Sequence, residues 1–142
     1  MKKLTAKSFL LLTIASTLLT ACNSSPTVSF ANTLSGIWRV EKIQETPIIF
    51  KSQVKLIFHA DGRLTGKASC NNFLSHYNVQ KDLLAIKPMN TTRKMCTSDL
   101  MQQESKLLKI LNKVRRFQSS NDQLSMFDQQ GHLLLKANKT KK

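Results

Sequence analysis

One segment of this chain, residues 98–114, has the apolar spacing of an amphipathic helix, and it separates two series of short segments that alternate like strands. On a helical wheel its apolar stripe consists of Leu100, Leu107, Leu111 and Val114. Three lysines fall on the opposite side: Lys106, Lys109 and Lys113. A helix with one apolar stripe buries it against another element, and the strand-like segments are the surface available to it.

The segments on either side of the helix are rich in β-branched and aromatic residues with partial alternation, which indicates strands. They cover residues 36–43, 53–59, 63–69, 73–79 and 83–87 before the helix, and residues 117–120, 123–127 and 132–137 after it. Ala60-Asp61-Gly62 supplies a hairpin turn, and residues 88–92 are typical of a loop. We therefore expect an α+β fold: a compact antiparallel β-sheet domain with one amphipathic helix packed across it.

The N-terminus has the pattern of a secretory signal. Lys2, Lys3 and Lys7 make it positive, and the mostly apolar residues 9–20 are fewer than the roughly 20 that span a bilayer. The sequence "LTAC", ending at Cys22, then resembles the lipobox of bacterial lipoproteins. That resemblance implies cleavage before Cys22, attachment of diacylglycerol to its thiol and acylation of the new N-terminus. The alternative is a plain signal peptide in which Cys22 is only the last apolar residue.

The lipobox resemblance also implies a location. Asn23, rather than an aspartate, follows the cysteine, as in enterobacterial lipoproteins that are sorted to the outer membrane. We expect a signal peptide over residues 1–21, a lipidated Cys22 and polar tether over residues 22–33, and one folded domain over residues 34–139. The expected place is the outer membrane, on its periplasmic side, with the lipid anchor as the membrane contact.

The chain is strongly basic, with 22 lysines and arginines against 8 acidic residues and a net charge of +14. Once residues 1–21 are removed, 19 basic and 8 acidic side chains remain, so a charge of +11 stays with the rest of the chain. Such a field favours anionic partners. Because nucleic acid is not expected in the periplasm, the expected partners are anionic lipid or an envelope protein.

A cluster of cations surrounds one face of the predicted helix and its end, and it consists of Lys106, Lys109, Lys113, Arg115 and Arg116. These side chains can form an ordinary solvated face, and cations at a helix C-terminus also complement its dipole. They can also contact anionic lipid or lipopolysaccharide beside the anchor. The sequence leaves both interpretations open.

Cys70 and Cys96 are the remaining thiols after Cys22. A pair of cysteines in an oxidising compartment indicates a disulfide. A metal site is the rival, but there is no C-x-x-C spacing, and His59, His76 and His132 are scattered singly. We expect the structural bridge, no metal and no cofactor.

Several motifs resemble the META-domain (HslJ-like) family of bacterial lipoproteins and periplasmic proteins. They are "GRLTGKASCNNF", "TTRKMC", the helix "MQQESKLLKIL" and the closing "QLSMFDQQGHLLL", and together they span about residues 34–137. By position, the family's motif residues are Asp61, Gly62, Gly66, Cys70, Asn71, Thr92, Arg93, Met95, Cys96 and Glu104. Ser69 stands where the family usually has a glycine. The resemblance implies a small antiparallel β domain crossed by one helix, and it implies no defined biochemical activity.

Glu104 lies near the centre of the helix's apolar face. An unpaired buried carboxylate is costly, so it needs a cation, several hydrogen-bond donors or a change in protonation. Arg93 is the expected ion-pair partner because its planar guanidinium can bind a carboxylate bidentately, and Asn71 can add its amide. Two interpretations remain: a structural ion pair that joins the helix to the loop beside Cys96, or a general acid or base in a cleft.

No nucleophile elbow, zinc-protease motif or glycine-rich phosphate loop is present, so we expect no catalytic residues. The leading hypothesis is a non-enzymatic envelope lipoprotein that supports envelope integrity or stress resistance through binding. The alternative is a pilotin-like chaperone that holds a lipid or a secretin tail in a crevice between helix and sheet. A third hypothesis is an enzyme that uses Glu104.

Overall fold

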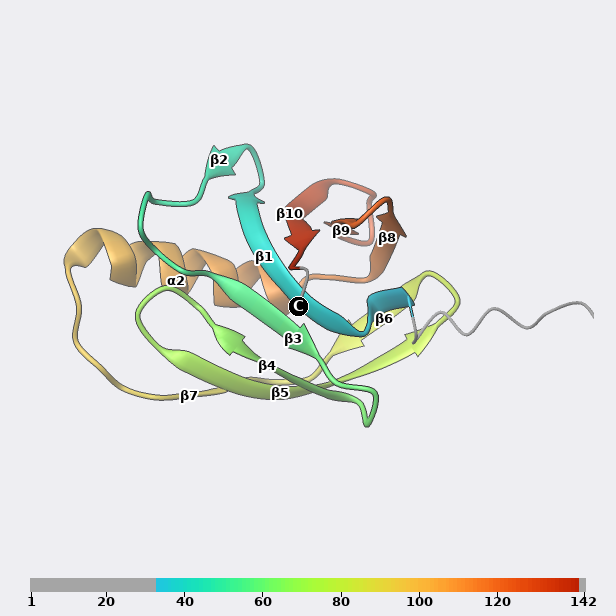
Figure 1. The fold of residues 1–142 in the computed structure, drawn as a ribbon, viewed down its shortest axis with the longest axis horizontal. Helices are drawn as coiled ribbons and strands as arrows, with labels where there is room; N and C mark the ends of the chain where they lie inside the picture. Colours follow the sequence, from blue (N-terminus) through green and yellow to red (C-terminus); the bar gives the residue numbers. More distant parts are fainter. Residues whose placement is uncertain (1–32, 141–142) are drawn as a thin grey trace, which may run out of the picture.

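The computed structural model describes residues 33–140, so the predicted signal peptide, Cys22 and most of the predicted tether lie outside the described residues. The elements in chain order are β1 (Gly36–Ile43), β2 (Thr46–Pro47), β3 (Lys55–Phe58), β4 (Arg63–Lys67), β5 (Asn72–Gln80), β6 (Leu83–Ile86), β7 (Asn90–Thr91), α2 (Ser98–Leu111), β8 (Arg116–Ser120), β9 (Gln123–Phe127) and β10 (Leu133–Lys139). Figure 1 shows the strands wrapped around a common interior with α2 beside them.

Eight strands form a closed antiparallel barrel in the order β1-β3-β4-β5-β6-β8-β9-β10, with β10 pairing back onto β1. The closing register joins Trp38 to Lys139 and Val40 to Ala137, and it shifts between Val40 and Lys42 at a bulge. Closure removes the exposed edges that an open sheet would leave. The shortest strand pairing in the barrel is that of β6 with β8, which has a single paired position, Leu83 with Arg116.

The expected antiparallel sheet with one helix is confirmed, but its closure into a barrel was not predicted. β1 and β9 have the predicted bounds, and the other main strands differ by a few residues. The two-residue strands β2 and β7 were missed; β7 lies in the predicted loop and pairs with Phe73 and Leu74 of β5. The helix ends at Leu111 rather than at Val114, which is buried in the turn that follows.

The interior of the barrel is filled by large apolar side chains. Their alternation along the strands is clearest in β5, where buried and exposed positions succeed one another. The largest fully buried members are Trp38, Phe58, Leu34, Ile43, Leu56, Leu64, Leu84, Leu107, Leu111, Leu124, Met126 and Leu135. The helix contributes two of these, so it shares one core with the strands. Every described strand and this core lie within residues 34–139.

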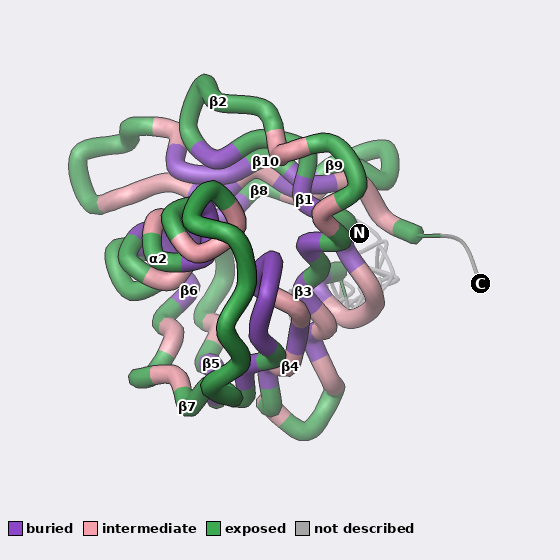
Figure 2. Tube along the Cα trace, turned by 90° about the vertical axis from the view of Figure 1, so that its left-hand side faces the viewer, coloured by how far each residue is buried: buried purple, intermediate pink, exposed green. Residues whose placement is uncertain are grey.

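The N-terminal half of α2 lies against the end of the barrel where the β2–β3 and β4–β5 connections meet (Figure 1). The segment that leads into it, residues 91–99, is exposed throughout, as Figure 2 shows in green. No helix in the described part of the chain has the length and apolar character that a membrane crossing needs.

Candidate functional site

Glu104 is buried against the turn that connects β4 to β5, with 6 % of its surface exposed. Its Oε2 accepts hydrogen bonds from the backbone N–H groups of Cys70 at 3.1 Å and Asn71 at 2.6 Å. Its Oε1 accepts a third from Asn71 Nδ2 at 2.8 Å. Three N–H donors offset the cost of burying a carboxylate, which can only accept hydrogen bonds.

The predicted ion pair between Glu104 and Arg93 is wrong. Arg93 is exposed, and the ion pairs within residues 33–140 are Arg63–Asp61 and His132–Asp128. The physical reason is that backbone and amide N–H groups already occupy both oxygens of the Glu104 carboxylate. No guanidinium is needed to offset its burial.

Asn71 extends this contact to the segment before the helix. Its Oδ1 accepts hydrogen bonds from Lys94 N at 2.7 Å and from Thr92 Oγ1 at 2.8 Å, and its Nδ2 also donates to the Lys94 carbonyl at 3.2 Å. The Thr92 hydroxyl oxygen in turn accepts from the backbone N–H of Asn72. Two of the predicted motif residues, Asn71 and Thr92, therefore hold the chain that leads from β7 to α2.

A disulfide joins Cys70 to Cys96 beside this network; the two residues are 26 positions apart in sequence, and their Cα atoms are 6.0 Å apart. It ties the β4–β5 turn to the same segment that Asn71 holds. Met95, the neighbouring motif residue, makes none of these contacts and is 89 % exposed. The polar network and the disulfide thus meet at the start of α2.

Gln103 is a second buried polar residue of the helix, and the sequence analysis missed it. Its Oε1 accepts from Ile49 N at 2.7 Å, and its Nε2 donates to Ser52 Oγ and Ser69 Oγ, each at 2.7 Å. One amide therefore joins α2 to both connections at this end of the barrel. The available signal was its place beside Glu104 on the edge of the apolar face.

Ser69 keeps the backbone conformation that a glycine would favour, with φ at 126°. A non-glycine residue is strained there, and the hydrogen bond from Gln103 to its hydroxyl offsets part of that strain. A different constraint applies at Gly66, where an added Cβ would lie 2.1 Å from the Lys55 carbonyl oxygen and 2.7 Å from the Phe73 ring. Gly66 therefore allows β3, β4 and β5 to pack closely.

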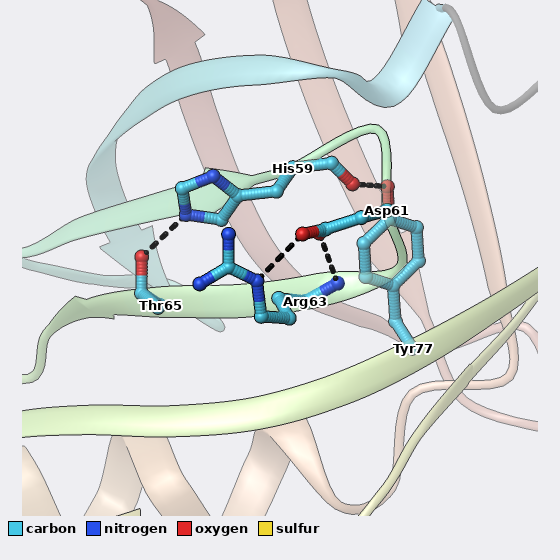
Figure 3. Close-up of polar contacts among 5 residues, drawn as sticks. All are labelled: His59, Asp61, Arg63, Thr65 and Tyr77. Carbon is cyan, nitrogen blue, oxygen red and sulfur yellow. Dashed lines mark hydrogen bonds and ion pairs between the residues drawn. The ribbon is translucent and has the colours of Figure 1, made fainter.

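The turn that contains the motif residues Asp61 and Gly62 forms a polar cluster between β3 and β4 (Figure 3). Asp61 Oδ2 lies 2.6 Å from Arg63 Nε, and Asp61 Oδ1 accepts from Arg63 N at 3.1 Å. These hydrogen bonds, first that of the side chain and then that of the backbone, lower the pKa of Asp61 below 3.8. His59 bonds to Thr65 through Nε2 at 2.9 Å.

Tyr77 fastens this turn from β5. Its hydroxyl donates to the His59 carbonyl at 2.7 Å, and its ring meets that of Phe58 edge to face at 5.0 Å. Burial, and then the nearby Asp61 carboxylate, raise the pKa of Tyr77 above 10.0. The raised pKa keeps the phenol protonated, and therefore able to donate. Its hydrogen bond to His59 joins β5 to the turn between β3 and β4.

The predicted basic cluster has mixed surroundings. Lys106 Nζ donates to Thr46 Oγ1 at 3.1 Å, whereas Lys109 and Lys113 are exposed. Arg115 turns back to donate to the carbonyls of Asn112 and Val114 just after the helix. Arg116 lies apart from the helix, in β8.

A groove of about 420 Å³ runs between α2 and the chain around β2. Its walls are Ile43, Thr46, Pro47, Ile49, Asp99, Gln102, Gln103 and Lys106, so Glu104 does not line it. Within residues 33–140, no three histidine, cysteine or acidic side chains are placed to hold a metal ion. Three of these residues are apolar and five are polar or charged, so the groove offers a ligand both kinds of contact.

The fold of this chain is similar to that of solved structures. A protein from Burkholderia xenovorans determined by NMR is 16 % identical with a TM-score of 0.65, over 79 % of this chain and 87 % of that one. Another NMR structure is 18 % identical with a TM-score of 0.62, over 76 % and 92 %. A DUF4847 family protein from Bacteroides vulgatus is 14 % identical with a TM-score of 0.55, over 76 % and 94 %.

No curated protein matches the chain. Comparison with family models gives a more specific result than the likeness in fold. The model of the META domain matches residues 31–141, which include all the described strands and the helix. The chain therefore belongs to the META-domain family.

Proposed function

We propose that this chain is a non-enzymatic lipoprotein of the cell envelope that acts by binding and so supports envelope integrity under stress. Its anchor is the diacylglycerol on Cys22, and its place is the outer membrane on the periplasmic side. The positive N-terminus, the short apolar segment and the lipobox-like "LTAC" support the anchor. The Cys70–Cys96 disulfide suits an oxidising compartment.

The observation that supports a non-enzymatic function is that both carboxylate oxygens of Glu104 accept hydrogen bonds from within the domain. Its carboxylate accepts three hydrogen bonds from the β4–β5 turn and does not line the groove beside α2. A general acid or base must reach the proton that it transfers, either directly or through one water. Glu104 instead meets the needs of a structural residue, which disfavours the enzyme hypothesis.

The groove between α2 and β2 is the binding surface that this proposal uses. Ile43, Pro47 and Ile49 give it apolar walls, and Gln102 and Lys106 add polar groups. An extended segment of an envelope protein matches this mixture. The barrel interior is filled by Trp38, Phe58 and other large side chains, so any ligand must bind outside it.

The second candidate function is a pilotin-like chaperone that holds a lipid or a secretin tail. The groove favours it, because it is a crevice between helix and strands with apolar walls. The filled interior disfavours deep enclosure of an acyl chain. Identification of the bound species separates the two functions: an acyl chain or a secretin tail supports the chaperone.

The anchor is tested by metabolic labelling with palmitate, in cells that express the chain or its Cys22→Ser variant. We expect label on the wild-type chain in the outer-membrane fraction and none on the variant. Absence of label from the wild-type chain would contradict the anchor.

The groove is tested by photo-crosslinking in intact cells. A photoreactive residue at Thr46 or Ile49 should give a discrete crosslinked product, whereas one at Gln118, an exposed position on β8, should not. Equal products from both faces, or none from the groove, would contradict binding there.

A further inference from the structure

Three cations stand directly opposite one another on three neighbouring strands. Arg39 of β1 pairs with Lys55 of β3, and Lys55 pairs with Lys67 of β4. Opposed residues of antiparallel strands point to the same face. The neighbouring pair, Trp38 and Leu56, is buried, so the cation row projects from the outer face of the barrel. We call Arg39, Lys55 and Lys67 the cation row.

Among the residues that the structure describes, no carboxylate forms an ion pair with this row. Like charges directly opposite each other in a sheet repel. The two strand positions that flank the row are asparagines: Asn138 opposite Arg39 and Asn72 opposite Lys67. Glu41 follows two residues after Arg39, but its Oε1 accepts a hydrogen bond from Asn138 Nδ2 and it forms no ion pair with the row.

A surface depression of about 620 Å³ adjoins the row and adds a fourth cation. Arg39, Lys51 and Lys55 line it together with Ile37, Ser52, Gln53, Val54 and Thr140, so no acidic residue does. Multiple cations around one concave surface attract anions in a field that neighbouring carboxylates do not cancel. The sequence continues after Thr140 with two more lysines, Lys141 and Lys142.

An exposed aromatic ring lies beside Lys51, one of the cations that line this depression. Phe50 is 87 % exposed, and Lys51 Nζ lies 5.9 Å from its ring centroid. A large exposed apolar side chain beside cations is the combination found in proteins that rest on anionic membranes, where rings enter the interface and cations meet head groups.

We propose that the cation row, Lys51 and Phe50 form a docking surface for an anionic phospholipid bilayer. The cations bind phosphate groups of the lipids, and the Phe50 ring inserts among them. This surface lies on the barrel, not on the basic face of α2.

The chain outside the structure supports this choice of partner. Gly36, the first residue of β1, is 14 positions from Cys22. Even fully extended, a chain of this length measures about 50 Å, so a lipid on Cys22 would keep the barrel within that distance of the membrane. This step rests on the lipid attachment proposed above. Vesicle binding by a protein without the anchor tests the surface separately, so one proposal can fail without the other.

The test uses the chain from residue 22 onward with Cys22→Ser, which retains the whole barrel and no acyl chain. Its sedimentation is measured with vesicles of phosphatidylglycerol and phosphatidylcholine, and with phosphatidylcholine alone, over a range of salt concentrations. We expect binding to the anionic vesicles only, weakening as salt rises. Absence of binding to either kind of vesicle, or equal binding to both, would overturn the proposal.

Two matched triple variants locate the surface. Arg39→Gln/Lys55→Gln/Lys67→Gln should weaken anionic-vesicle binding by more than about tenfold. Its melting temperature should stay equal or rise, because the repulsion within the row is gone. Lys106→Gln/Lys109→Gln/Lys113→Gln removes the same charge from α2 and should weaken binding much less. Equal losses, or a larger loss from the helix variant, would overturn the assignment.

A fluorescent ring reports insertion directly. Trp38 is the single tryptophan of the chain and is buried, so its emission should not change on binding. In Phe50→Trp, the emission maximum of the new indole should shift to shorter wavelength when anionic vesicles are added. An emission spectrum that stays unchanged while the protein binds would contradict insertion at this position.

Discussion

Glu104 and Asn71 lie 33 positions apart in the chain and meet at two points. The backbone N–H of Asn71 lies 2.6 Å from Glu104 Oε2, and its side-chain amide lies 2.8 Å from Oε1. Because Asn71 also holds Lys94, this pair connects the helix, the β4–β5 turn and the segment before the helix. The principal polar residues of the site thus fasten the end of the barrel.

Reduction of the Cys70–Cys96 disulfide should destabilise the domain by roughly 3 kcal/mol, because the bond closes a long loop in the unfolded chain. Trp38 fluorescence in a denaturant titration, with and without reductant, measures the change. The control is Cys70→Ser/Cys96→Ser, whose midpoint should not respond to reductant. A wild-type midpoint that reductant leaves in place would count against this role.

Gly66→Ala should lower the free energy of unfolding by at least about 1 kcal/mol, because the new Cβ would overlap the Lys55 carbonyl. Gly131→Ala is the matched control. Gly131 has φ of 87°, but an added Cβ would have its nearest contact at 3.6 Å, so backbone strain alone applies there. Thermal unfolding should therefore rank Gly66→Ala below Gly131→Ala, and the reverse order would refute close packing at Gly66.

Tyr77 should titrate above pH 10.0, because burial and the Asp61 charge disfavour the phenolate. It is the single tyrosine of the chain, so tyrosinate absorbance reports it alone. Since the folded-state pKa is the higher one, this group's contribution to stability is present below pH 10 and is lost as pH rises through the folded pKa. Asp61→Asn should lower the Tyr77 pKa partway. A Tyr77 pKa at or below 10.0 would contradict this environment.

Gln103→Ala should release the β2–β3 connection, because the Ile49 N–H loses its acceptor. Amide hydrogen exchange at Ile49 should accelerate at least about fivefold, the equivalent of about 1 kcal/mol. Gln102→Ala changes the neighbouring, exposed helix position and should leave exchange at Ile49 as it is. If the two variants behave alike, Gln103 does not anchor this connection.

The strands and the helix could be predicted because their signals are local. Alternation along β1 reflects one face buried against the core, and so does the four-residue spacing of Leu107 and Leu111 in α2. Barrel closure has no such signal. It depends on pairing between β1 and β10, such as Val40 with Ala137, and no short window contains both strands. β2 and β7 are two residues long, too short for any period.

The sequence indicated some residues of the candidate site but not their hydrogen bonds, and the motif residues Arg93 and Met95 are exposed. Glu104 and Asn71 stood out from the buried face and the family motif, and both lie in the network. The partner assigned to Glu104 was wrong because backbone N–H groups, which every sequence contains, replace the expected Arg93. Gln103 was missed because a polar residue at the edge of an apolar stripe is usually solvated, and here two turns cover it.

The central claim is that Glu104 holds the helix to the barrel by accepting hydrogen bonds from the β4–β5 turn. The most direct test is thermal and denaturant unfolding of Glu104→Ala beside Glu45→Ala, which removes an exposed carboxylate. We expect Glu104→Ala to lose about 3 kcal/mol or more, because it leaves buried N–H groups of Cys70 and Asn71 without an acceptor. We expect Glu45→Ala to change stability by less than about 0.5 kcal/mol. A Glu104→Ala protein as stable as Glu45→Ala would contradict the claim.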